Sequence, residues 1–269
     1  MLKGLVSRLK NSIKPKQFSV SGIRSSLGEQ GRGMDVMLFD EIDSTSLHAR
    51  RLLEKGKHAP FLVVANSQSA GRGRLGRSFY SPAGSGLYMS VALRGSDASA
   101  VSLTTKASVA LCRAIEAVFG ISDTGIKWVN DVYVGGKKVA GILAESVASG
   151  TGSNTVILGI GVNISTENFP AELSKIAASL GVKGERRSEL CGAICRELFA
   201  LIASESTEYM DEYRRRSIVI GREVTYFVSG EERIGHVDAI LDSGALEVTT
   251  ASGEREILNS GEITLRVRK

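Results

Sequence analysis

Residues 126–163 read IKWVNDVYVGGKKVAGILAESVASGTGSNTVILGIGVN, and the fold class follows from this segment. Runs rich in Val and Ile predict strands at 126–129, 132–134, 139–147 and 155–162. Turns as short as Gly135-Gly136 join strands that pair antiparallel. The segment therefore predicts a mainly antiparallel group of strands.

The sequence before and after this segment supplies further strands and three helices. Strands are expected at 34–38, 61–65 and 87–93, where apolar residues alternate or run together. One helix should begin at Ser44 or Thr45 and end at Gly56, a second should run over 107–118, and a third over 190–202. Clustered strands with helices set apart predict an α+β domain, a mixed β-sheet with helices on one face.

Beyond Gly221 the pattern changes to five short strand-like runs, centred near Val224, Val237, Leu246, Ile257 and Leu265. A small closed or nearly closed β-barrel accommodates such short strands. We therefore place a domain boundary within 217–221, with a large domain over 34–217 and a small C-terminal domain over 218–269.

Residues 1–33 are expected to form a basic N-terminal arm. Leu2, Leu5, Leu9 and Ile13 recur at helical spacing, which fits a transit-like or membrane-surface helix, or a frayed helix packed on or beside the main domain. The Lys and Arg residues of the first 24 positions outnumber the whole net charge of +5, so the remainder is close to neutral. A broad nucleic-acid-binding face is not expected, and one helix is too little for a three-helix DNA-binding unit.

The composition is typical of a globular protein, since 42% of the 269 residues are hydrophobic. Apolar runs fall short of the roughly 18 residues that span a membrane, and no secretory signal is evident, so we expect a cytoplasmic protein without a membrane span. Cys112, Cys191 and Cys195 lack the spacing of a disulfide framework or a zinc site, and are expected to be buried thiols. The three histidines are scattered, and we assign them no role.

Residues 68–79 read QSAGRGRLGRSF and alternate glycine with arginine between two predicted strands. Glycine allows the backbone to fold tightly around a ligand, and arginine offers a planar, permanently charged fork for carboxylate and phosphate. A flexible RNA-binding tract is the alternative. Because the pattern occurs once and leads into a Ser81-Pro82 turn, we favour a specific anion-binding loop.

A second polar group lies on the predicted strands at 127–145. Lys127 and Lys138 can meet phosphate or carboxylate oxygens, and Asn130 and Asp131 can bind ribose, base or hydrated magnesium. Taken alone, Asn-Asp between strands is usually a turn. Trp128, the only tryptophan, is more typical of a core than of a stacking platform.

The third group is VILGIGVNI at 156–164. It is similar to a GxG phosphate turn, but no capped helix follows it, so a dinucleotide-binding fold is excluded. Two glycines within an apolar strand instead leave room for a ligand against the sheet, with Asn163 as a polar contact. Ser44-Thr45 fits either a plain helix cap or a ligand contact.

In this order and spacing, the segments resemble the biotin protein ligase family over residues 34–269. That family carries a GRGRxGRxW loop, a KWPND segment, a KxxGIL segment and a GxGxN strand, preceded by Ser-Thr and followed by a small SH3-like barrel. The resemblance is to the monofunctional form without an N-terminal DNA-binding domain, and it implies a class II synthetase-like biotin–lipoate ligase catalytic domain. It also implies an enzyme that converts biotin and ATP to biotinyl-5′-AMP and transfers biotin to a lysine of a carrier domain, such as that of acetyl-CoA carboxylase.

The resemblance implies a set of site residues. Biotin would be surrounded by Ser44, Thr45, Gln68, Gly71, Arg72, Lys138, Gly141, Leu143 and Gly159. ATP would be held by Arg74, Arg77, Phe79, Asn130, Asp131, Lys138 and Asn163. Lys138, Arg72 and Lys127 would be catalytic, and Asp131 would hold Mg²⁺ through water. Phe79 and Val129 stand where the family usually has Trp and Pro, and the missing indole donor bears on ATP affinity.

Forming such an adenylate brings two anions together, so the site must neutralise charge without offering a competing nucleophile. Lys138 and Arg72 would hold the carboxylate in line, while Arg74, Arg77 and Mg²⁺ would stabilise the phosphates. The Gly-Arg loop should be mobile when empty and close over the reactive intermediate, with Arg72 as its anchor.

Three other functions fit parts of the sequence. A lipoate or octanoate protein ligase shares the implied fold and also acylates carrier lysines. A non-enzymatic regulator that binds biotinyl-AMP would need a DNA-binding unit, and an RNA-binding module would use the Gly-Arg loop. The identity of the carrier and the formation of a homodimer stay open.

Overall fold

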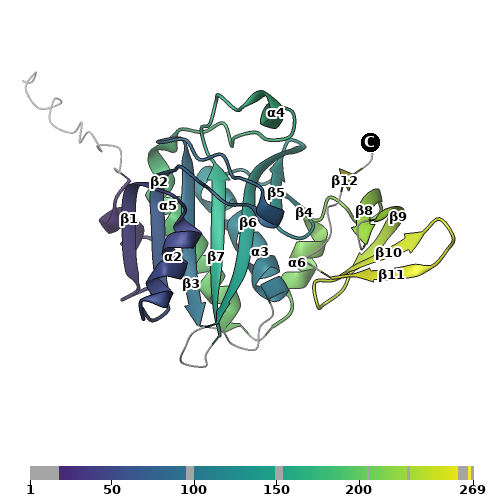
Figure 1. Cartoon of the computed structure of the whole chain (residues 1–269), viewed down its shortest axis with the longest axis horizontal. Coiled ribbons are helices and arrows are strands. Elements are labelled where there is room, and N and C mark those ends of the chain that lie inside the picture. The colour runs from purple at the N-terminus through teal and green to yellow at the C-terminus, as the bar shows by residue number, and fades with distance from the viewer. Residues whose placement is uncertain are drawn as a thin grey trace, which may run out of the picture.

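A computed structural model describes residues 18–94, 100–148, 154–204, 206–228, 231–259 and 266–267. These residues form a seven-stranded sheet with helices and, after it in sequence, a five-stranded sheet (Figure 1). Within the described residues, no helix is long and apolar enough to cross a membrane.

The large sheet has the strand order β1-β2-β3-β7-β6-β5-β4. Its strands are β1 (Asp35–Ile42), β2 (Phe61–Gln68), β3 (Gly86–Arg94), β4 (Gly125–Lys127), β5 (Asp131–Val134), β6 (Lys137–Ala148) and β7 (Asn154–Asn163). Only β1 and β2 pair parallel among the described strands of this sheet, and the others pair antiparallel. The predicted mixed sheet and its antiparallel half are confirmed.

Helices cover both faces of this sheet, although unequally. The long helices α3 (Ala100–Phe119) and α5 (Arg187–Ala203) pack on one face, as expected. The shorter α2 (Thr45–Glu54) packs on the opposite face, in front of the sheet in Figure 1, so not all helices lie on one face. Strand β2 explains this arrangement, because its side chains are apolar on both faces of the sheet. Leu62 and Val64 belong to the hydrophobic cluster under α3 and α5, and Phe61 and Val63 belong to a second cluster under α2.

The described part of the N-terminal segment belongs to the large domain. Helix α1 (Val20–Arg24) contacts α5, and Ile23 and Leu27 are buried in the main hydrophobic cluster. Ile23 and Leu27, within the predicted arm 1–33, thus pack in the core of the large domain, which fits the alternative of a segment packed on that domain. Leu2, Leu5, Leu9 and Ile13 lie outside the described residues.

The remaining helices are short: α4 (Ala171–Ser174) and α6 (Tyr209–Arg215). The five-stranded sheet has the order β11-β10-β9-β8-β12 and is antiparallel throughout. Its strands are β8 (Glu223–Val228), β9 (Glu231–Ile240), β10 (Leu246–Thr250), β11 (Arg255–Leu258) and β12 (Arg266–Val267). Five strands were predicted here, and the fifth includes Arg266 and Val267, whereas Leu265 lies outside the described residues.

The three cysteines are buried and free, as predicted. Cys112 lies on α3, and burial raises the pKa of its thiol to about 11. A thiol that stays protonated in an apolar core packs as a small hydrophobic side chain.

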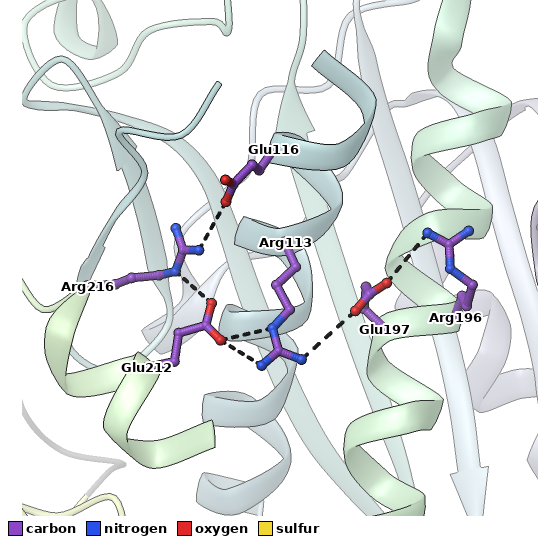
Figure 2. A network of polar contacts seen from close by, with 6 residues as sticks. All are labelled: Arg113, Glu116, Arg196, Glu197, Glu212 and Arg216. Atoms are coloured by element: carbon purple, nitrogen blue, oxygen red, sulfur yellow. Dashed lines mark hydrogen bonds and ion pairs between the residues drawn. The ribbon is translucent and has the colours of Figure 1, made fainter. Parts of the chain in front are cut away.

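A chain of ion pairs joins α3, α5 and α6 (Figure 2). Its members are Arg113, Glu116, Arg196, Glu197, Glu212 and Arg216. Glu212 is the most buried of the carboxylates, with its side chain 14% exposed, and it accepts hydrogen bonds from both Arg113 and Arg216. The network thereby fixes α6, and the segment leading to the small sheet, against α3.

We expect Glu212→Gln to lower the free energy of unfolding by about 2 kcal/mol at neutral pH, because a neutral amide replaces a largely buried carboxylate that binds two guanidinium groups. Burial raises the pKa of Glu212, but the hydrogen bonds from Arg113 and Arg216 outweigh it and hold the pKa below its ordinary 4.5. A carboxyl with a lowered folded pKa stabilises above its unfolded pKa and loses that contribution as the pH falls. Urea denaturation should therefore show the difference from wild type shrinking between about pH 7 and about pH 3.

Glu116→Gln is the matched control for this prediction. Glu116 binds the same Arg216 at 3.2 Å, but its side chain is 47% exposed. An exposed pair contributes less than about 1 kcal/mol, so this variant should change the free energy of unfolding little. Equal losses in the two variants would contradict the assignment of the stability to the buried carboxylate.

Candidate functional site

A cavity of about 240 Å³ lies on the α2 side of the large sheet, where its floor is formed by β6 and β7. The Gly-Arg loop, the turn between β4 and β5, and the segment 169–177 form its walls. Every site residue predicted from the sequence lines it except Gly71: Ser44, Thr45, Gln68, Arg72, Arg74, Arg77, Phe79, Lys127, Asn130, Asp131, Lys138, Gly141, Leu143, Gly159 and Asn163. The structure thus brings together residues that are distant in sequence.

Three glycines in the floor of the cavity expose the backbone of β6 and β7 to a ligand. A Cβ atom on Gly159 would lie 2.6 Å from Ser46 Oγ, and one on Gly161 would lie 2.6 Å from the Phe79 ring. Gly141 is the third, and its Cβ would lie 3.3 Å from the Lys138 Nζ atom. The prediction that glycines on these strands leave room against the sheet agrees with this geometry.

One end of the cavity is built on the N-terminus of α2. Ser44 caps the helix, and Gln68 Oε1 accepts hydrogen bonds from the Thr45 backbone N–H at 2.9 Å and from Thr45 Oγ1 at 3.1 Å. The Gln68 amide nitrogen donates in turn to Ser81 Oγ at 2.9 Å, and Ser90 Oγ donates to Thr45 Oγ1 at 2.8 Å. These hydroxyl and amide groups are oriented by one another, which prepares them to bind a polar ligand.

Gly71 lies behind the cavity wall and shapes the loop. Its Cβ atom would lie 2.4 Å from the Phe79 carbonyl oxygen and 2.9 Å from the Gln68 amide nitrogen. The Phe79 backbone N–H also donates to the Gly71 carbonyl at 2.9 Å. Any side chain at position 71 would therefore push the two ends of the loop apart.

Lys138 and Asp131 form an ion pair inside the cavity, with the Lys138 Nζ atom 2.6 Å from Asp131 Oδ1. Both residues lie on the paired strands β5 and β6, where the register shifts beside them. The Lys138 side chain is 31% exposed and that of Asp131 21%, so both groups are partly shielded from water. Lys127 lines the same wall.

Two loop arginines are held in different ways. Arg74 Nη1 donates to Asn130 Oδ1 at 3.0 Å and so crosses from the loop to the turn between β4 and β5. Asn130 is itself fixed, because its side-chain amide donates to the Ile142 carbonyl at 2.8 Å. Burial lowers the pKa of Arg74 from its ordinary value, although the guanidinium group remains charged. Arg72 instead binds Glu145, at 3.1 Å.

Phe79 and Asn163 stand on either side of Gly161. The Phe79 ring makes an edge-on contact with the Tyr88 ring, with centroids 6.3 Å apart. Asn163 is 5% exposed and donates to the Ala178 carbonyl at 3.3 Å, while its Oδ1 atom is buried without a hydrogen-bond partner among the described residues. A buried acceptor of this kind is suited to a donor on a ligand.

One wall of the cavity consists of residues that the sequence motifs did not predict. Phe169, Leu173, Ile176 and Ala177 come from an irregular segment around α4. Two backbone hydrogen bonds attach it to β6, from the Lys138 N–H to the Ile176 carbonyl and from the Ala178 N–H to the Lys138 carbonyl. Such a segment has no periodicity, so the only signal was its apolar residues within a polar stretch.

Trp128 is buried, as its apolar character suggested, and it links the site to the small sheet. Its indole Nε1 donates to the Gly244 carbonyl at 2.8 Å. Val129, also buried, follows it through a cis peptide bond, and its carbonyl accepts from the Tyr213 hydroxyl at 3.0 Å. The segment that carries Lys127, Asn130 and Asp131 is thus fixed from behind.

The site gathers cationic side chains around a floor that contains three glycines, and hydroxyl and amide groups at one end. Such an arrangement can hold two anionic molecules close together and stabilise charge that moves between them. Among the described residues, no group of three or more His, Cys, Asp or Glu side chains could hold a metal ion by itself.

Comparison with known proteins gives a consistent result. Residues 38–163 match the sequence model of the Biotin/lipoate A/B protein ligase family. The chain is 32% identical over 259 residues to the bifunctional ligase/repressor BirA of Bacillus spizizenii, covering 92% of this chain and 79% of that protein. It is 32% identical over 234 residues to the biotin--[acetyl-CoA-carboxylase] ligase of Paracoccus denitrificans, covering 82% and 96%.

Among solved structures, the biotin protein ligase of Aquifex aeolicus in complex with biotin and ATP is similar, with a TM-score of 0.76. The two sequences are 28% identical, and the match covers 87% of this chain and 99% of the other.

Proposed function

The chain belongs to the Biotin/lipoate A/B protein ligase family and is a biotin protein ligase, and we propose from this premise how its cavity performs the reaction. The enzyme activates biotin with ATP as biotinyl-5′-AMP and transfers biotin to a lysine of a carrier protein. The observation that supports our assignment is the convergence of Lys138, Arg72 and Arg74 on one glycine-floored cavity.

We assign the end near α2 to biotin. The hydroxyl and amide groups of Ser44, Thr45 and Gln68 suit the polar ureido ring, and the small residues of β6 and β7 accommodate the rest of the molecule. The proposed biotin contacts are Ser44, Thr45, Gln68, Arg72, Lys138, Gly141, Leu143 and Gly159, with Gly71 shaping the loop behind them. Arg72 and Lys138 would meet the carboxylate.

We assign the other end to ATP. Its proposed contacts are Arg74, Arg77, Phe79, Asn130, Asp131, Lys138 and Asn163. The arginines suit phosphate, the Phe79 ring offers a stacking surface for adenine, and the buried Asn163 Oδ1 atom can accept from a base donor. Lys138 lies between the two ends, where the reacting groups must meet.

The chemistry needs charge neutralisation more than a protein nucleophile. A carboxylate oxygen of biotin attacks the α-phosphorus, the bond to the bridging oxygen breaks, and pyrophosphate leaves with the electron pair. Lys138, Arg72 and Lys127 would reduce the repulsion between the two anions and stabilise the transition state. The amine of the carrier lysine then attacks the biotinyl carbonyl carbon and expels AMP, losing a proton as the amide forms.

We propose that Mg²⁺ enters with ATP and that Asp131 holds it through water. One carboxylate and the oxygens of the phosphates fit the coordination that Mg²⁺ prefers. The bound ion would supply further neutralisation of phosphate charge.

We further propose that the acceptor is the carrier protein or domain of a biotin-dependent carboxylase, in keeping with the name of the Paracoccus denitrificans relative. The direct test mixes the chain with ATP, magnesium, biotin and a carrier domain, and identifies biotin on the carrier lysine by mass spectrometry. Lipoate and octanoate are offered in parallel reactions. Transfer of either acid in preference to biotin would favour the lipoate ligase alternative.

Phe79→Ala should raise the KM for ATP about ten- to hundredfold, the loss expected when a base no longer stacks on an aromatic ring. Biotin affinity measured by calorimetry without ATP should stay within about twofold, because Phe79 contacts Gly161 rather than the proposed biotin end. Phe79→Trp should retain or improve the affinity for ATP. An unchanged KM for ATP in the alanine variant would remove Phe79 from the nucleotide site.

A further inference from the structure

Glu145 is a largely buried acidic residue that binds two arginines, one of which lines the cavity. It lies on β6, its side chain is 15% exposed, and its carboxylate lies 3.1 Å from Arg72 Nη1 and 3.3 Å from Arg50 Nη2. Arg72 lines the cavity, whereas Glu145 and Arg50 lie outside its lining. The carboxylate that binds Arg72 therefore does not itself line the ligand space.

The contact with Glu145 uses only one of the three guanidinium nitrogens of Arg72, and the other two can bind a ligand. Nη1 alone reaches Glu145, at 3.1 Å to one carboxylate oxygen and 3.2 Å to the other. A guanidinium group carries five N–H donors, so Nη2 and Nε can bind a second carboxylate while Nη1 stays on the first. This differs from Lys138, whose partner Asp131 itself lines the cavity.

Arg50, the other arginine that binds Glu145, helps to hold the Glu145 side chain in place. Arg50 belongs to α2 and Glu145 to the central part of the sheet, so their pair joins two regular elements. Arg72 belongs to the Gly-Arg loop. Because Arg50 helps to fix Glu145, the ion pair between Glu145 and Arg72 can hold this loop in one position. A largely buried carboxylate that binds two cations is also held in position by them.

We propose that Glu145 is a positioning residue, which holds Arg72 so that its remaining donors face the carboxylate of biotin. The proposal rests on the proposed function, in which Arg72 binds that carboxylate. It adds a residue to the machinery that does not touch either substrate.

Steady-state kinetics of biotin-dependent pyrophosphate exchange test this in the full chain. Glu145→Gln should raise the KM for biotin about tenfold, the effect of weakening one charge-assisted hydrogen bond, and leave the KM for ATP within about twofold. In an Arg72→Gln background the same substitution should have no further effect on the KM for biotin, because the group that Glu145 positions is already gone. Equal effects in both backgrounds would overturn the proposal.

Arg50→Gln is the matched control, since it removes the ion pair between Arg50 and Glu145 and leaves the ion pair between Arg72 and Glu145 in place. It should change the KM for biotin less than Glu145→Gln does. If Glu145→Gln does not fold, Glu145→Asp decides the question in its place, because aspartate keeps the charge but is one methylene too short to reach both arginines. Inactive wild-type protein would count against the proposed function, whereas active wild type with an unaltered KM for biotin in the Glu145 variant would count against this inference alone.

Discussion

Replacing Lys138 with alanine should lower the rate of biotin-dependent pyrophosphate exchange by about a hundred- to thousandfold, the loss typical of removing one preorganised group that stabilises transition-state charge. The Nζ atom of Lys138 is the cation at the meeting point of the two proposed substrate ends, and Asp131 already orients it at 2.6 Å. Both kcat and kcat/KM should fall, because the charge that Lys138 offsets is greatest in the transition state.

The fold should survive this substitution. The contacts of residue 138 with the segment at 176–178 are made by its backbone N–H and carbonyl, which alanine retains. Lys137→Ala is the matched control: its exposed side chain reaches the Ser174 carbonyl at 3.4 Å and does not line the cavity. Thermal unfolding should be nearly unaltered in both variants, and wild-type exchange in Lys138→Ala would remove the lysine from the reaction.

Much of the site could be predicted because its residues lie in short segments with a strong local pattern. Gly159 and Gly161 alternate with apolar residues, and a strand of period two must place both glycines on one face. The Gly-Arg loop likewise combines residue types that have few structural reasons to occur together. Chemistry that depends on residue type and spacing is therefore visible in the sequence.

Other features depend on tertiary contacts that no local pattern encodes. The run at 61–65 is apolar on both faces, so periodicity could not show that α2 and the long helices pack on opposite sides. Ile23 and Leu27 lie in a Ser- and Gly-rich stretch, where two buried residues give little signal of packing against α5. Ile176 reaches the site only because its segment pairs with β6.

The structure gives the Gly-Arg loop two contacts, of which the sequence predicted one. Arg72, the predicted anchor, contacts Glu145, and a second contact, from Arg74 to Asn130, crosses from the loop to the opposite wall. Glu145 lies on β6, which also forms part of the cavity floor. The spacing of three arginines in the loop could not distinguish these partners, because Asn130 lies in the turn between β4 and β5 and Glu145 lies on β6.

Arg74→Ala should accordingly release biotinyl-AMP about ten- to hundredfold faster than wild type, since a largely buried, charge-assisted hydrogen bond that spans the cavity is lost. The escaped adenylate is a mixed anhydride and reacts with exposed amines, so labelling of bystander proteins should rise as transfer to the carrier becomes less efficient. Release is measured by forming labelled biotinyl-AMP without acceptor and chasing with unlabelled biotin.

Arg72→Ala provides the comparison that separates the two arginines. It leaves the contact between Arg74 and Asn130 intact, and the group that Arg72 is proposed to bind loses its negative charge once the adenylate has formed. This variant should therefore weaken the binding of biotin while retaining the adenylate much better than Arg74→Ala. Release that is equally fast in both variants would show that closure depends on the charge of the loop as a whole rather than on the bridge from Arg74 to Asn130.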